Sequence, residues 1–271
     1  MIKGIDVSKH NGKIDWKSVK KDGIDFAILR AGYGKNNIDE QIYNNIIGCE
    51  TNKIRIGMYW FSYAYTEEMA RNEANYVCDI ADTTSLQFPV CFDFEYDSLD
   101  YAAQQGVTIT PELMVNLATV FLTRVEERGY YAMNYTNIDY FNKGFYELKD
   151  RFDVWLASWS STEPSTETYG HAIWQYSNKG VVNGIRGNVD LNYSHYDQFN
   201  FHREVTEESK GEKDMGNTAS SWATEATEWA KTNGLMTGDE NGDMHYQDSI
   251  TREEMVTVLY RYNQLKDKAG K

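Results

Sequence analysis

The chain has 271 residues and a formal net charge of −14 at pH 7, so it is long enough for a large domain, alone or with a small one, to bury a core. The acidic balance excludes a dedicated nucleic-acid binder, since such proteins carry clustered basic residues. No run of the sequence reaches the roughly 18 apolar residues of a membrane span, so neither nucleic acid nor a membrane is an expected partner.

Short apolar runs alternate with helix-length segments along the first half of the chain. The predicted strands are Gly4–Val7, Phe26–Ala31, Ile56–Ser62, Pro89–Glu95, Tyr131–Tyr135, Val154–Ala157, Ala172–Gln175 and Val189–Asn192, and the predicted helices are Trp16–Lys21, Glu40–Asn52, Glu67–Ile80 and Pro111–Arg128. Strand–helix alternation is typical of a parallel sheet, and eight strands suffice to close a barrel. After Ala157 the connecting segments carry no convincing helix. The pattern therefore predicts an α/β barrel with five β/α units followed by three strands with poor helical cover.

The composition changes after the last predicted strand. Residues 204–214 are almost all polar or charged, which is typical of a linker. Beyond it we predict two helices, Thr218–Asn233 and Thr251–Leu265, around a turn region. These features divide the chain into a barrel (residues 1–203), a charged linker (204–214) and a small helical module (215–271). Such a module, of about 55 residues, is below the size that usually buries an adequate core alone.

The cysteines and histidines show neither a disulfide framework nor a metal motif. Cys49, Cys78 and Cys91 are odd in number and lie among apolar residues, which predicts buried free thiols. No histidine or cysteine lies at zinc-ligand spacing. A calcium loop at residues 239–243 is only weakly supported, because Met244 and Ile250 stand where an EF-hand needs Gly and Glu. We therefore expect no metal and no cofactor.

Two carboxylates lie at the end of the predicted strand Pro89–Glu95. Because alternate side chains of a strand share a face, Cys91, Asp93 and Glu95 face the barrel mouth, and the apolar residues between them face the helical layer. Buried carboxylates are costly unless they are paired or used. A salt bridge to a buried arginine such as Arg30 is the structural alternative. Catalytic groups of barrel enzymes lie at this end of the strands, which favours a catalytic pair.

Two further carboxylates fit the same rim. Asp6 ends the first predicted strand and Asp190 lies in the last one, and in a closed barrel these two strands are neighbours. Four crowded carboxylates cannot all ionise easily, so the pKa of at least one of them should be raised. One protonated acid beside charged carboxylates is the arrangement that cleavage of a glycosidic bond requires.

At this point the residues match a known family. Five motifs in the right order carry the resemblance: residues 6–16 (DVSKHNGKIDW), Tyr59-Trp60-Phe61, Asp93-Phe94-Glu95, Trp174-Gln175-Tyr176 and Val189-Asp190. Over roughly residues 1–199 the chain resembles the family-twenty-five glycoside hydrolases, the Chalaropsis-type lysozymes common among phage endolysins and bacterial autolysins. The resemblance implies a flattened (β/α)5(β)3 TIM-like barrel. The first motif often has Gln where this chain has Asn11.

The resemblance also implies roles for the acids. Glu95 would be the general acid for the β-1,4 bond between N-acetylmuramic acid and N-acetylglucosamine in bacterial peptidoglycan. Asp93 would assist the substrate's N-acetyl group as internal nucleophile, a known departure from the two-carboxylate scheme. Asp6 and Asp190 would position the others. Direct attack by a water activated by an aspartate, with inversion, stays open. The expected substrate-binding aromatics are Tyr33, Tyr59, Phe61, Tyr135, Trp159 and Trp174.

The C-terminal module resembles one S-layer homology repeat, which attaches proteins to a secondary cell-wall polymer. The resemblance rests on a pattern that includes Trp222, Trp229, Arg252 and Glu253, and these are the expected wall-binding residues. Exposed apolar residues on a lone pair of helices favour self-association through the module, and a monomer whose tail docks on the barrel is the alternative. Met215 stands just after the linker and is a candidate internal start that would supply free copies of the tail.

Three other functions compete with a muramidase. A catalytically inactive wall-polysaccharide-binding lectin is one, and the intact Asp93 and Glu95 pair argues against it. A Mg²⁺-dependent hydrolase that uses the four acids as ligands is the second, and a structural wall protein is the third. The sequence shows no signal peptide before its first predicted strand, so we expect synthesis in the host cytoplasm and action on the cell wall after release.

Overall fold

The computed structural model describes residues 1–199, 224–238, 244, 257–258 and 260–262. The chain divides into two compact units, Met1–His202 and Arg203–Lys271, and each is described by itself. Among the described residues, no helix is both long enough and apolar enough to cross a membrane.

The first unit is a closed barrel, as predicted. Its strands are β1 (Ile2–Val7), β2 (Phe26–Tyr33), β3 (Asn37–Ile38), β4 (Arg55–Phe61), β5 (Val90–Asp93), β6 (Ala132–Asn137), β7 (Asp153–Ala157), β8 (His171–Gly180) and β9 (Val189–Ser194). They pair in the order β1-β9-β8-β7-β6-β5-β4-β2-β3, and an additional β1–β2 pairing closes the ring. Strand β9 runs antiparallel to both of its neighbours. Residues at the start of β9 therefore lie at the same end of the barrel as the last residues of the parallel strands.

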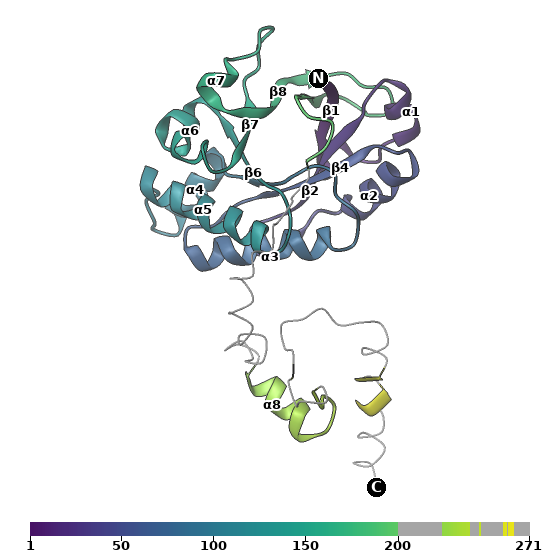
Figure 1. Cartoon of the computed structure of the whole chain (residues 1–271), viewed down its shortest axis with the longest axis vertical. Helices are drawn as coiled ribbons and strands as arrows, with labels where there is room; N and C mark the ends of the chain where they lie inside the picture. The colour runs from purple at the N-terminus through teal and green to yellow at the C-terminus, as the bar shows by residue number, and fades with distance from the viewer. Residues whose placement is uncertain (200–223, 239–243, 245–256, 259, 263–271) are drawn as a thin grey trace, which may run out of the picture. The chain divides into compact units, whose positions relative to one another are not determined.

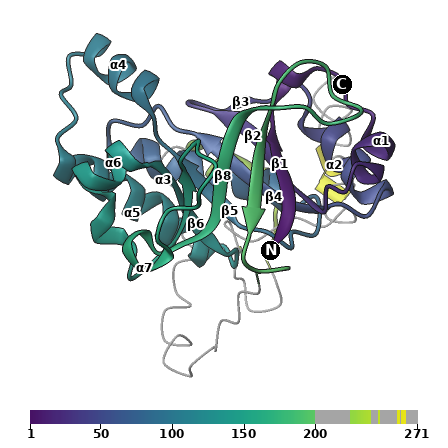
Figure 2. The same ribbon diagram turned by 90° about the horizontal axis from the view of Figure 1, so that it is seen from above.

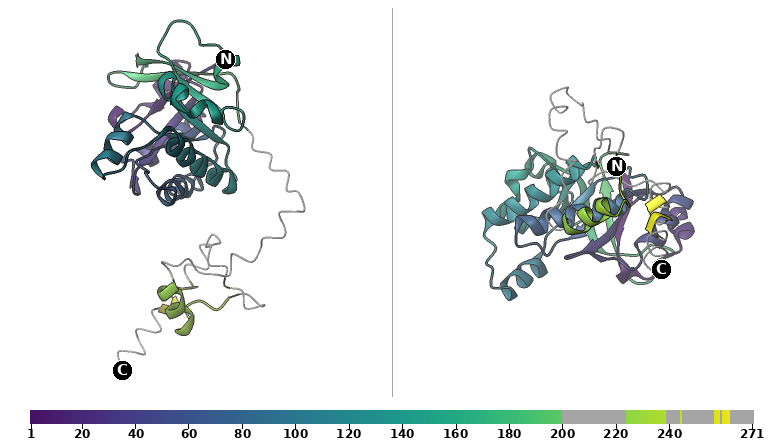
Figure 3. Two further views of the ribbon diagram at one scale, coloured as in Figure 1. Left: turned by 90° about the vertical axis from the view of Figure 1, so that its left-hand side faces the viewer. Right: turned by 90° about the horizontal axis from the view of Figure 1, so that it is seen from below.

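Helices surround most of the barrel. They are α1 (Trp16–Lys21), α2 (Ile42–Thr51), α3 (Glu67–Ala81), α4 (Tyr96–Gln104), α5 (Pro111–Glu127), α6 (Ile138–Lys143) and α7 (Thr166–Tyr169), with two 3-10 turns, η1 (Lys9–Asn11) and η2 (Phe145–Leu148). In Figure 1, α1 to α6 line the outside of the barrel, whereas α7 is a single turn beside β8. The left view in Figure 3 shows the blue and teal helices on one side of this unit and the green strands that end it on the other. The prediction of poor helical cover over the last three strands is confirmed.

Two apolar clusters follow from the alternation of side chains along the strands. One fills the space between the sheet and the helices and contains Val90, Phe92 and Phe94 of the β5 segment. The other lies on the inner face of the strands and contains Cys91. The predicted split of this strand into an apolar outer face and an inner face is therefore confirmed. The three cysteines are buried and free, as predicted.

All eight predicted strands are present, and the differences concern short elements. The sequence pattern missed β3, α4, α6 and the single turn α7. Helix α4 buries only Ser98 and Ala102, and Figure 2 shows it at the margin of the barrel. A helix of nine residues repeats the 3.6-residue pattern only about twice, which leaves sequence patterning little to detect.

The second unit is described only in part. Helix α8 spans Thr224–Thr232, inside the predicted helix Thr218–Asn233, and Leu235 after it is buried. Arg261 donates a hydrogen bond of 3.1 Å from Nη1 to the carbonyl oxygen of Leu235. The predicted linker at residues 204–214, the turn at residues 239–243 and most of the predicted second helix lie outside the described residues.

Candidate active site

The end of β5 and the residue just before α4 hold the central acid pair, Asp93 and Glu95. Strand β5 ends at Asp93, so the prediction that Glu95 lies on the strand is wrong. Glu95 is the residue before α4, and its φ of −129° and ψ of −169° keep it extended. Because the backbone stays extended to Glu95, the alternation of faces continues beyond the last ladder hydrogen bond. Both carboxylates therefore share the inner face.

Asp6 and Asp190 meet where the barrel closes. The two residues are direct partners in the antiparallel β1–β9 ladder. Oδ2 of Asp6 accepts hydrogen bonds from Nε2 of Gln175 at 3.0 Å and from Nδ2 of Asn192 at 2.8 Å. Oδ1 of Asn192 in turn accepts a hydrogen bond from Nε1 of Trp155 at 2.8 Å. Two side-chain amides thus fix the Asp6 carboxylate.

Burial raises the pKa of all four carboxyl groups. For Asp93 burial is the largest cause, and the charges of Glu95 and Asp6 add to it. For Asp6 the charge of Asp190 adds to the effect of burial. The pKa of Glu95 is also raised, mainly by burial, while hydrogen bonds to Asp93 and Tyr135 oppose the rise. Burial raises the pKa of Asp190 as well. The site therefore favours protonated carboxyl groups beside charged ones, as the crowding of acids predicts.

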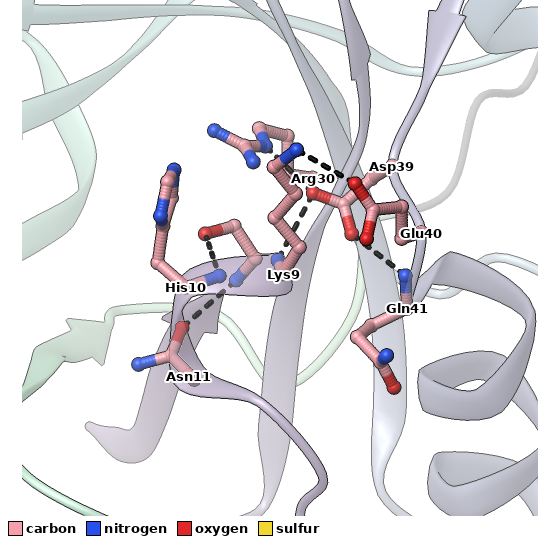
Figure 4. Close-up of polar contacts among 8 residues, drawn as sticks. Lys9, His10, Asn11, Arg30, Asp39, Glu40 and Gln41 are labelled. Atoms are coloured by element: carbon pink, nitrogen blue, oxygen red, sulfur yellow. Dashed lines mark hydrogen bonds and ion pairs between the residues drawn. The ribbon is translucent and has the colours of Figure 1, made fainter.

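Arg30 does not form the salt bridge that a purely structural role for the acid pair would require. Its Nε lies 2.8 Å from Oδ2 of Asp39, a fully buried carboxylate. Figure 4 shows this pair beside the first turn of the chain after β1, where Asp39 also accepts a hydrogen bond from the backbone N–H of Lys9 at 3.0 Å. The Arg30 charge lowers the pKa of Asp93 only as a minor contribution. The main partner of Arg30 is thus Asp39.

Four predicted aromatic residues line the inner face around Asp93. Phe61 and Tyr135 are its direct register neighbours on β4 and β6, and Tyr33 is the neighbour of Phe61 on β2. Tyr59, one pleat below Phe61, packs edge-on against Trp155 at 6.1 Å between ring centroids. The structure therefore brings Tyr33, Tyr59, Phe61 and Tyr135 together with the acids.

The two predicted tryptophans differ in position. Trp159 is 60% exposed and donates a hydrogen bond of 3.0 Å from Nε1 to Oε1 of Gln175, the same oxygen that Tyr135 Oη contacts at 3.2 Å. Trp174 is buried on the other face of β8 from Gln175, where it packs against Tyr193. The structure does not bring Trp174 into the group that surrounds the acids.

Sequence patterning missed the residues that hold this group in place. Gln175 was visible only as part of the Trp174-Gln175-Tyr176 motif, and Asn192 carried no signal. A further buried hydrogen-bond network, formed by Ser98 and Ser62, holds the backbone of Glu95. Ser98 Oγ donates to the carbonyl oxygen of Ser62 at 2.7 Å and accepts a hydrogen bond from the backbone N–H of Glu95 at 3.0 Å.

The same network ends at Glu73, a buried carboxylic acid on α3. Its Oε2 lies 2.5 Å from Ser62 Oγ, and its Oε1 accepts a hydrogen bond from the backbone N–H of Tyr63 at 3.0 Å. Burial raises the pKa of Glu73 to about 8, although both hydrogen bonds lower it. The turn after β4 is therefore held by a group that is protonated in the folded protein near neutral pH.

This raised pKa predicts a pH-dependent stability. The folded state keeps the Glu73 proton up to about pH 8, whereas the unfolded chain releases it near pH 4.5. The contribution of Glu73 is therefore fully present below about pH 4.5 and is lost as pH rises towards 8, at about 1.4 kcal/mol for each unit by which its pKa is raised. In Glu73→Gln, an uncharged isostere, urea unfolding should show a smaller loss of stability between pH 5 and pH 8 than in the wild type.

The matched control for this measurement is Glu68→Gln, which changes an exposed carboxylate one turn earlier on the same helix. It should keep the pH dependence of the wild type. Equal pH slopes for the wild type and Glu73→Gln would contradict the raised pKa.

Among the described residues, the four acids do not bring three ligand atoms within 4.8 Å of one another. Within the described part of the chain, a single group of His, Cys, Asp and Glu side chains places three ligand atoms within 4.8 Å of one another, and its members are Glu163, His171 and His195. None of them belongs to the acid cluster. The geometry therefore gives no support to a Mg²⁺-dependent hydrolase built on Asp6, Asp93, Glu95 and Asp190.

The family model for "Glycosyl hydrolases family 25" matches residues 5–185, which is most of the chain and contains the end of β1 and all of β2 to β8. The chain belongs to the glycosyl hydrolases of family 25. It is thus a glycoside hydrolase, and the resemblance noted from its motifs is confirmed. The model of the S-layer homology domain matches residues 213–256 of this family-25 hydrolase.

Relatives and solved structures agree with this assignment. Lysozyme M1 of Streptomyces globisporus is 27% identical over 204 residues, which cover 70% of this chain and 67% of the relative. The modular autolysin LytC of Streptococcus pneumoniae, solved in complex with a synthetic peptidoglycan ligand, is 25% identical with a TM-score of 0.62. The match covers 70% of this chain but only 46% of LytC.

One solved structure matches along almost the whole chain. The CTP1L endolysin, whose activity is regulated by a secondary translation product, is 21% identical with a TM-score of 0.59, and the match covers 97% of this chain and 100% of that one. At this identity the match supports the fold of the family-25 hydrolase alone.

Proposed function

We propose that the protein is a muramidase that hydrolyses the β-1,4 bond between N-acetylmuramic acid and N-acetylglucosamine in bacterial peptidoglycan. The observation that carries the proposal is the pair Asp93 and Glu95, which share the inner face at the carboxyl end of β5, in a chain of family 25. The lysozyme and autolysin relatives support peptidoglycan as the substrate.

In the proposed mechanism, Glu95 donates its proton to the glycosidic oxygen as the bond to C1 of the muramic acid breaks. The raised pKa of Glu95 keeps that proton available. Asp93 orients the N–H of the substrate's N-acetyl group, whose carbonyl oxygen attacks C1 and forms a cyclic intermediate. Glu95 then removes a proton from the water that opens this ring, so the configuration at C1 is retained.

Asp6 and Asp190 adjoin each other on the inner face and maintain the pattern of protonated and charged carboxyl groups around Asp93. Asp6 is fixed by the amides of Gln175 and Asn192, so it is arranged to act through its charge and position. Direct displacement by a water activated by an aspartate is the alternative mechanism, and it would invert the configuration at C1.

Mass spectrometry of digested peptidoglycan tests the proposal. A muramidase leaves N-acetylmuramic acid at the new reducing ends, whereas a glucosaminidase leaves N-acetylglucosamine. A catalytically inactive lectin would leave no new reducing ends at all. Activity that persists in chelator would remove the magnesium-dependent alternative. Analysis of the first products by NMR distinguishes retention from inversion.

We also propose that the S-layer homology domain holds the enzyme on the wall through a secondary cell-wall polymer. The match over residues 213–256 supports this role. Trp229 is 51% exposed on α8 and is available to a ligand, whereas Trp222, Arg252 and Glu253 lie outside the described residues. Removal of residues 215–271 should reduce binding to purified walls.

We further propose that this domain associates with other copies of itself, including free copies that begin at Met215. Trp229 and Tyr260 are 51% and 65% exposed in this small unit, and association would remove part of such apolar surface from water. Several copies would also repeat the polymer site and raise avidity. The regulation of the CTP1L endolysin by a secondary translation product supports this idea by analogy.

Met215→Leu should remove the short product without changing the barrel. In the wild type we expect a second band that begins at Met215 and co-purifies with the full chain, and a light-scattering mass above that of one chain. In Met215→Leu the band should disappear and fewer tails should bind each full chain. Met236→Leu, which changes another methionine of the same unit, is the matched control and should keep the band. A single band and a one-chain mass for the wild type would overturn the proposal.

A further inference from the structure

Three side chains from distant parts of the barrel meet at one carboxylate oxygen. Oε1 of Glu163 lies 3.0 Å from Nε2 of His171 and 2.7 Å from Nε2 of His195. Glu163 belongs to the loop between β7 and α7, His171 begins β8, and His195 directly follows β9. The ligand atoms of all three lie within 4.8 Å of one another. Two neutral imidazole nitrogens and one carboxylate oxygen are a common donor set for zinc.

The cluster lies at the opposite end of the barrel from the acids. His171 pairs with Val154 at the start of β7, and the end of β9 next to His195 pairs with Ile2 at the start of β1. Figure 2 shows α7 and the N-terminus at one end of the strands and α4, which follows the acid pair, at the other. A ligand here would not reach the substrate.

We propose that Glu163, His171 and His195 bind one zinc ion, or a similar divalent transition metal, at the amino-terminal end of the barrel. A tetrahedral ion with bonds of about 2.0–2.1 Å keeps its ligand atoms about 3.3 Å apart. The two Glu163 contacts, at 3.0 and 2.7 Å, are shorter than that spacing, and the two imidazole nitrogens lie within 4.8 Å of each other, so Glu163 and the partly exposed His195 ring would both shift to hold an ion. Three protein ligands leave one position for a water molecule.

Burial and access both fit a metal site. The His171 side chain is fully buried, so its position is fixed by the surrounding core. Glu163 and His195 keep 23% and 29% of their side chains exposed, which leaves an entry path for an ion. Imidazole ligands favour zinc, copper and nickel over magnesium and calcium.

The expected role of the metal is to stabilise the part of the barrel that lacks helices. The ion would join the β7–α7 loop, the start of β8 and the chain just after β9, which is the last segment before the second unit. A ligand that binds only the folded state stabilises it by mass action. At 100 times the dissociation constant, Zn²⁺ should raise the melting temperature of the barrel by roughly 5–10 °C.

Calorimetry and thermal unfolding of the full chain, freed of metal by a chelator, test the proposal. We expect ZnCl₂ to raise the melting temperature of the wild type and MgCl₂ to leave it unchanged. Glu163→Gln and His195→Ala change ligands that are partly exposed and should fold, but should lose the response to ZnCl₂. Glu167→Gln, which removes an exposed carboxylate from the neighbouring α7, should respond as the wild type does.

Two outcomes would overturn the proposal. A wild-type protein whose melting temperature does not rise with ZnCl₂ has no such site, and the three contacts are then hydrogen bonds alone. A response that persists in both Glu163→Gln and His195→Ala places the ion elsewhere in the chain. As an independent readout, Co²⁺ should give the strong visible absorption of a four-coordinate ion in the wild type but not in Glu163→Gln.

Discussion

Glu95→Gln should lower lysis of bacterial walls by a factor of about 10²–10⁴, the typical contribution of a general acid. The amide matches the carboxyl group in shape, but it has no acidic proton for the departing oxygen. Because the residue precedes α4 and is held through its backbone N–H by Ser98, the substitution should leave the fold intact. The loss should therefore appear in kcat, with KM and wall binding little changed.

A turbidity assay on purified walls measures the loss, and circular dichroism checks the fold. Glu147→Gln changes an exposed carboxylate in η2 and should keep wild-type activity. A Glu95→Gln protein that keeps more than a tenth of the wild-type rate would show that another group supplies the proton.

The raised pKa of Glu95 also sets the sign of the pH dependence. A general acid works only in its protonated form, so activity should fall as pH rises through the pKa of Glu95. Burial moves that pKa upward, and the fall should therefore begin at a higher pH than an exposed glutamate would give. The residual activity of Glu95→Gln should not show this fall with rising pH.

The sequence predicted the barrel well because its strands are continuous apolar runs that are buried on both faces. Alternation along the β5 segment also predicted which side chains face inward. That prediction held for Glu95 even though the strand ends at Asp93, since the backbone stays extended for two more residues. Closure of the barrel then made Asp6 and Asp190 neighbours, which a linear pattern alone does not show.

The residues that the sequence did not predict are those whose partners lie far away along the chain. Gln175 and Asn192 reach Asp6 across 169 and 186 positions, and a single amide in a strand carries no periodic signal. The cluster of Glu163, His171 and His195 was not predicted from the sequence for the same reason. Its members come from a loop, a strand start and the segment after a strand, so no zinc-ligand spacing appears in the sequence. Trp174 was predicted to contact the substrate, and this prediction is not supported. Side chains alternate along β8, so Trp174 lies on the opposite face of the strand from Gln175.

Asp93→Asn should reduce kcat at least tenfold. Oδ1 of Asp93 is buried and has no hydrogen-bond partner among the described residues, and in the proposed mechanism the Asp93 carboxyl group accepts the substrate N–H. In the Asp93→Asn variant, the side chain can present an N–H instead of an oxygen to the substrate's N-acetyl group. The variant also lacks the negative charge that would stabilise the cyclic intermediate. Both changes weaken the assistance that the N-acetyl group needs.

Asp6→Asn and Asp190→Asn should cost less than Asp93→Asn, and this order distinguishes the two mechanisms. Asp6 accepts hydrogen bonds from two amides, and an asparagine oxygen can still accept them, so its loss is one of charge and not of position. If Asp93→Asn were neutral while Asp6→Asn were inactive, a direct displacement by an activated water would replace the substrate-assisted scheme.

A substrate that lacks the N-acetyl group gives a second measure, because only the substrate-assisted enzyme needs that group as a nucleophile. The wild type should then lose activity on it, and Asp93→Asn should add little further loss.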